Sequence, residues 1–115
     1  MEANKNFRIQ KKNLNELQTD VCEKGKAAVV TAGGLTFHMI TMEPGYRWSK
    51  HMKPLAKTES CQNPHVLYVI SGRFRAKMDD GKEEEFGSGD IGVMPPGHDV
   101  WTIGDKPAVL LHISH

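Results

Sequence analysis

The sequence predicts an all-β fold, a single barrel or jelly roll of antiparallel strands. From residue 27 onward, short runs rich in β-branched and apolar residues recur along the chain. Turn signals separate these runs at intervals of about 8–12 residues, the spacing typical of barrels and sandwiches. Two of the turns contain Gly33-Gly34 and Asp80-Gly81, which are dipeptides that favour tight β-hairpins.

The chain is expected to form one domain over residues 1–115, since this length suits a single hydrophobic core. Leu14 and Leu17 are three residues apart, which predicts a short helical turn within an N-terminal arm over residues 1–26. A barrel core is expected over residues 35–113. The strands expected are residues 27–31, 35–42, 65–70, 73–78, 82–86, 91–94, 100–103 and 108–113.

Composition excludes several classes of partner. The net charge is +1, whereas nucleic-acid-binding domains usually carry a strongly basic face. The first 20 residues are polar and no long apolar run follows, so neither a signal peptide nor a membrane span is expected. We therefore expect a cytoplasmic protein in which Cys22 and Cys61 are reduced thiols.

Two segments carry glycine, proline and histidine at fixed spacings, one over residues 45–72 and one over residues 89–98. They resemble the two motifs of the cupin superfamily, and the matching positions are Gly45, His51, His65, Gly72, Gly89, Pro95 and Gly97. The resemblance covers residues 35–113. It implies a cupin-type β-barrel, or double-stranded β-helix, with one divalent metal ion inside.

Two further runs resemble a subgroup of small single-domain cupins, similar to domains attached to some nucleotide cyclases. The first is Ser60-Cys61-Gln62 followed by Pro64-His65, and the second is Pro95-Pro96-Gly97-His98-Asp99 followed by Trp101. This closer resemblance favours a non-catalytic binding or sensory module.

The chain departs from the cupin pattern at two ligand positions. The usual second histidine of the first motif falls at Lys53, and the histidine of the second motif falls at Val100. A second register places Glu59 and Cys61 at the two histidine positions of the first motif, and the sequence leaves both registers open. Since side chains alternate along a strand, His98 is expected to share a face with Val100.

The metal site that the resemblance implies would use His51, His65 and His98, with Cys61 or alternatively Glu59 as a fourth ligand. Imidazole ligands suit zinc, iron or nickel, and three histidines with an open position form a catalytic geometry. Lys53 is expected on the same face as His51, where it could hold a substrate carboxylate.

The remaining aromatic and histidine residues are expected to have structural roles. Strand parity places Trp48, Tyr68 and Trp101 on the outer face, as packing residues or part of a dimer interface. His38, His112 and His115 lie away from the motifs and are expected to have no role in the site.

Three functions remain open from the sequence. The first is a metal-dependent enzyme (a dioxygenase, isomerase or lyase) acting on a small organic acid. The second is a non-catalytic ligand-binding or sensory cupin, and the third is a metal-free barrel that binds an apolar ligand. The resemblance also implies a homodimer formed by exchange of N-terminal strands.

Overall fold

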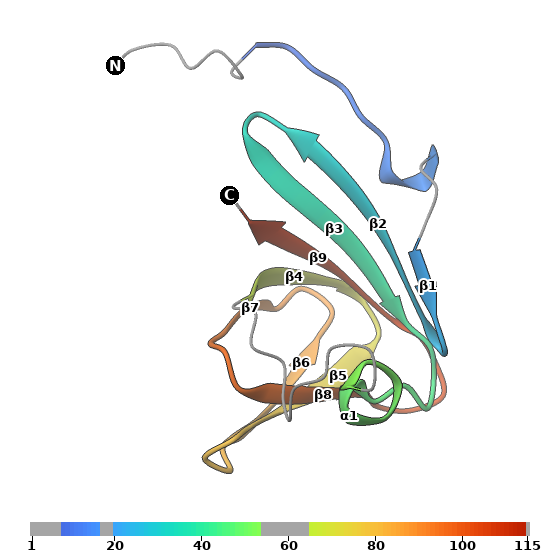
Figure 1. The fold of residues 1–115 in the computed structure, drawn as a ribbon, viewed down its shortest axis with the longest axis vertical. Helices are drawn as coiled ribbons and strands as arrows, with labels where there is room; N and C mark the ends of the chain where they lie inside the picture. Colours follow the sequence, from blue (N-terminus) through green and yellow to red (C-terminus); the bar gives the residue numbers. More distant parts are fainter. Residues whose placement is uncertain (1–7, 17–19, 54–64, 115) are drawn as a thin grey trace.

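A computed structural model describes residues 8–16, 20–53 and 65–114 of the chain. Within these ranges the strands form two antiparallel sheets that face each other (Figure 1). One sheet has six strands in the order β1-β2-β3-β9-β4-β7, and the other has three in the order β6-β5-β8. A single turn of 3-10 helix precedes them at Leu14–Glu16, and a short helix, α1, spans Trp48–His51.

The expected strands are confirmed, with small shifts at their ends. They are β2 (Gly25–Ala32), β3 (Leu35–Met42), β4 (His65–Ser71), β5 (Arg73–Met78), β6 (Glu83–Gly87), β7 (Ile91–Met94), β8 (His98–Thr102) and β9 (Ala108–Ser114). The hairpin β2-β3 turns at Gly33 and Gly34, whose φ angles are +61° and +79°. Positive φ at both central residues matches the twist of a two-residue hairpin, which explains the glycine pair.

Two elements differ from the sequence prediction. Strand β1 (Asp20–Cys22) pairs with β2, so part of the expected N-terminal arm belongs to the six-stranded sheet. Residues 48–51 form helix α1 rather than extended chain. Trp48 was expected on the outer face by strand parity, and this is wrong because a helix does not alternate its side chains: Trp48 is buried in the core.

The core lies between the two sheets. Leu67 and Val69 of β4 are buried from one sheet, and Phe74 of β5 is buried from the other. Phe74 also stacks on Phe86 of β6, with ring centroids 5.0 Å apart. Burial of alternate residues along β4 and β8 gives each sheet one inner and one outer face.

The outer face of the six-stranded sheet exposes a continuous apolar surface. Tyr68 is 43% exposed and pairs with Ile91, while Val66 pairs with Val93, and Ile91 and Val93 are more than 70% exposed. The outward orientation expected for Tyr68 is therefore confirmed. Large exposed apolar patches of this kind are typical of interfaces, so we propose this face, in place of exchanged N-terminal strands, as the contact of a homodimer.

We expect size-exclusion chromatography with light scattering to give twice the mass of one chain. Replacing Ile91 and Val93 by Lys should shift the protein to the monomer, because two buried charges per copy would oppose association. The variant Lys77→Glu, on the outer face of the three-stranded sheet, should remain dimeric. A wild-type chain that stays monomeric at high micromolar concentration would remove the proposal. No helix in the described ranges is long and apolar enough to cross a membrane.

Candidate functional site

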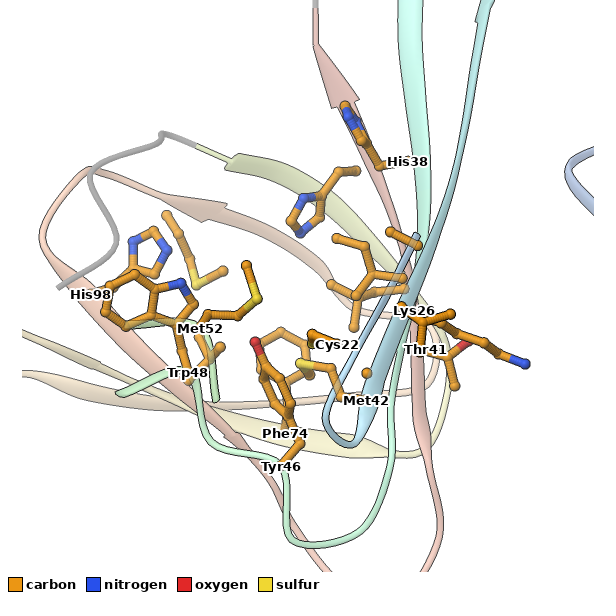
Figure 2. Close-up of a pocket in the computed structure, with 18 of the residues that line it drawn as sticks. Cys22, Lys26, His38, Thr41, Met42, Tyr46, Trp48, Met52, Phe74 and His98 are labelled. Carbon is orange, nitrogen blue, oxygen red and sulfur yellow. The ribbon is translucent and has the colours of Figure 1, made fainter. Parts of the chain in front are cut away.

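A cavity of about 730 Å³ lies between the two sheets, beside helix α1. Its wall includes three aromatic side chains, Tyr46, Trp48 and Phe74 (Figure 2). Thioether and aliphatic side chains also line it, among them Met42, Met52, Met94, Ile40 and Leu110. The cavity is in the size range of small-molecule sites, which are mostly apolar with a few polar groups.

His98 is the predicted ligand that the structure places most clearly in this wall. It begins β8 and is 1% exposed. Its Nδ1 lies 2.7 Å from the carbonyl oxygen of Pro95, which can only accept a hydrogen bond, so Nδ1 carries the proton. A backbone carbonyl that accepts from Nδ1 is the arrangement that orients metal-binding histidines, in which Nε2 is the nitrogen that binds the metal.

The predicted shared face of His98 and Val100 is confirmed. Both are buried, together with Thr102, and the residues between them are not. His98 and Val100 both line the cavity. An imidazole two residues before the usual cupin position therefore reaches the same interior space.

His51 and Lys53 are not among the residues that line the cavity. His51 ends α1, and its Nδ1 lies 3.0 Å from the backbone nitrogen and 3.1 Å from the carbonyl oxygen of Arg47. Its ring stacks on Tyr46 with the centroids 5.7 Å apart. Nε2 of His51 could bind a metal in the tautomer whose Nδ1–H donates to the Arg47 carbonyl oxygen, and not in the tautomer whose Nδ1 accepts the Arg47 N–H.

The other predicted ligands lie partly or wholly outside the described residues. Glu59 and Cys61 fall in the segment 54–64, and for His65 only the backbone at the start of β4 is described. Within residues 8–16, 20–53 and 65–114, no three His, Cys, Asp or Glu side chains gather closely enough to hold a metal ion. The four-residue metal set therefore remains a prediction. Among its members whose side chains the structure describes, His98 is the one that lines the cavity.

Sequence reasoning missed two histidines that line the cavity. His38 of β3 and His112 of β9 were expected to have no role in the site, yet both are in its wall. They are direct cross-strand partners in the antiparallel pairing of β3 with β9. Alternation along a strand places His38 on the same face as Ile40 and His112 on the same face as Leu110. This could indicate a shared site only once β9 was known to lie next to β3.

Helix α1 is held against β8 by a polar cluster on the outer side. The Asp99 carboxylate accepts the Ser49 backbone N–H and the Arg47 side-chain Nε–H, both at 3.0 Å. The Arg47 guanidinium lies 4.3 Å from the centre of the Trp101 ring. Trp101 thus packs outward as expected, and this cluster fixes the helix that carries Trp48 into the cavity.

Replacing Asp99 by Ala should lower the free energy of unfolding by about 1–3 kcal/mol, because two hydrogen bonds to a charged and largely buried acceptor are lost. Urea unfolding followed by circular dichroism measures the change. Asp105→Ala, at an exposed carboxylate in the loop before β9, is the matched control and should change stability by less than about 0.5 kcal/mol. Equal effects of the two substitutions would contradict the role given to Asp99.

Cys22 also contributes to the cavity wall from β1. Burial raises the pKa of the Cys22 thiol, and the neighbouring charge of Glu23 raises it further. A raised pKa lowers the thiolate fraction at neutral pH, and the thiolate is the reactive form. Cys22 is therefore a weak nucleophile and acts as part of the apolar wall.

Comparison with known proteins gives structural likeness only. No protein-family model and no curated protein matches the sequence. The structure matches the formate complex of Lactobacillus farciminis oxalate decarboxylase with a TM-score of 0.63, at 20% identity over 87% of this chain and 31% of that chain. It matches Bacillus subtilis oxalate decarboxylase at pH 4.6 with a TM-score of 0.63, at 27% identity over 88% of this chain and 28% of that chain.

A third match, to a Neisseria meningitidis protein, has a TM-score of 0.57 at 16% identity and covers 76% of this chain and 80% of that chain. Two facing antiparallel sheets around an apolar cavity define a small β-barrel of the jelly-roll class. Because oxalate decarboxylases are cupin-fold proteins, the likeness shows that this chain has the cupin fold. It spans less than a third of the length of the oxalate decarboxylases that it matches.

Proposed function

We propose that this protein is a metal-dependent cupin that acts on a small organic acid inside the barrel. The observation that carries the proposal is His98, a buried imidazole in the cavity wall whose Nδ1 is held by a backbone carbonyl. The oxalate decarboxylases support it, since the Bacillus subtilis protein has Mn(II) centres and the Lactobacillus farciminis protein was obtained with formate.

The metal would be held by His98 and His65, with Cys61 or Glu59 and the Nε2 of His51 as further ligands. The backbone of His65 pairs with that of Met94 at the start of β4. The donor set suits zinc, iron or nickel, and the Mn(II) of the Bacillus subtilis protein adds manganese. Such an ion would polarise a carboxylate or activate a bound water.

Metal analysis of the full chain tests the proposal. Protein purified without chelators or a histidine tag should contain about one divalent ion per chain. His65→Ala should lower this to a small residual fraction, while His51→Ala distinguishes the two registers: loss of metal supports the register that uses His51, and retention supports the one that uses Glu59 and Cys61. Absence of metal from the wild-type protein after addition of zinc, iron, nickel and manganese in turn would overturn the proposal.

A metal-free barrel that binds an apolar ligand is the second candidate. Val100 stands where cupins usually have a metal-binding histidine, and the cavity wall is mostly apolar. If the chain binds no metal but a hydrophobic fluorophore is displaced from it by small apolar compounds, this function replaces the first. Metal retained without turnover of any small carboxylate would favour a sensory cupin.

A further inference from the structure

We infer that His38 and His112 form a carboxylate-binding site in the cavity, for an acid that has an apolar body. Figure 2 shows His38 on the opposite side of the cavity from His98. Neither His38 nor His112 belongs to the proposed metal-ligand set. The inference deepens the proposed function by naming the class of acid, but the pair itself does not require a metal.

The pairing of β3 with β9 brings the two imidazoles together. His38 and His112 are opposite each other in the register, and both line the cavity. Direct cross-strand partners have their Cβ atoms about 4.5–5.5 Å apart, so both rings can reach one carboxylate. The Nε2 of His112 is buried, which places its polar edge away from bulk water.

The chemistry of the wall favours an anion over a cation. None of the described residues that line the cavity is Asp or Glu, so no carboxylate there would repel an acidic ligand. A carboxylate buried in an apolar cavity needs hydrogen-bond donors. Each imidazole offers an N–H in the neutral form and two in the protonated form, so the pair can supply donors to both carboxylate oxygens.

The volume decides between a very small acid and one with an apolar body. A space of about 730 Å³ corresponds to the liquid volume of roughly two dozen water molecules. A two-carbon dicarboxylate would fill only a fraction of this and would bring a second charge against apolar walls. Trp48 and Phe74, with Ile40 and Leu110, instead offer apolar contact to a chain or ring attached to one carboxylate.

Calorimetric titration of the full chain after removal of metal with a chelator tests the inference, with hexanoate and benzoate as probes. Both should bind more tightly than hexan-1-ol and than oxalate, by roughly tenfold or more. His38→Leu/His112→Leu should weaken hexanoate by roughly tenfold and leave hexan-1-ol within about twofold, since Leu has no hydrogen-bond donor and only the donors to the carboxylate are lost. Lys77→Gln, an exposed change on the other sheet, should not alter either probe.

Nuclear magnetic resonance of the wild-type protein provides a second readout that does not depend on a variant. The ring-proton signals of His38 and His112 should shift on addition of hexanoate and not on addition of hexan-1-ol. Equal binding of the acid and the alcohol, or unchanged hexanoate binding by the double variant, would overturn the inference. Loss of bound metal in the double variant would also overturn the inference, because it would show that His38 and His112 are metal ligands. The proposal of a metal site would then hold with a different set of ligands.

Discussion

Replacement of Gly72 by Ala should lower the free energy of unfolding by about 3 kcal/mol or more, a large part of the stability of a domain of this size. Gly72 makes the corner where the chain leaves β4 for β5, with φ at +75°. A Cβ at this position would lie 2.1 Å from the carbonyl oxygen of Pro107 and 2.7 Å from the Cα of Ala108. Both are backbone atoms, so a side-chain rotation cannot relieve the clash.

Gly104→Ala is the matched control for this prediction. Gly104 has a similar φ of +84°, but a Cβ there would meet no atom within 4 Å. Only the strain of a left-handed conformation is added, so a loss of about 1–2 kcal/mol is expected. Urea unfolding of the two variants separates crowding from strain, and losses of equal size would show that the packing against Pro107 has no role.

Replacement of His98 by Ala should weaken binding of the proposed metal by at least about 100-fold. Removal of a residue that only hydrogen-bonds to a metal ligand typically lowers metal affinity about 10–100-fold, and removal of the ligand itself should lower it further. Competition with a chelating dye measures the affinity. Val100→Ala, on the same face of β8, is the control and should bind metal normally because it removes no nitrogen ligand.

A rescue experiment makes the test more specific. Val100 lines the cavity two residues from His98 on the same face and occupies the usual cupin histidine position. The double variant His98→Ala/Val100→His should therefore bind the metal at least about tenfold more tightly than His98→Ala does. Normal metal binding by His98→Ala would show that the metal lies elsewhere in the protein.

The strands and the cavity histidines differed in how far the sequence could predict them. The β-strands from 25 to 114 were predictable because alternation and turn residues act locally. The shared face of His98 and Val100 followed from the same alternation. Helix α1 could not be predicted in this way, because its four residues are too few to show a helical period and its position depends on Asp99, distant in the sequence.

The role of His38 and His112 depended wholly on which strands become neighbours. Each histidine alone is an ordinary strand residue, and the pair exists only because β9 inserts between β3 and β4. Trp48 shows the same limit, since its inward orientation comes from a helix that the local pattern did not reveal.

By itself the sequence determined the β class, the strand positions and the glycine and proline corners, because each of these follows from backbone preferences of nearby residues. Only the tertiary structure decided which side chains line one cavity. Strand order and the docking of α1 arise from contacts between residues far apart in the chain, and local preferences carry no information about those contacts.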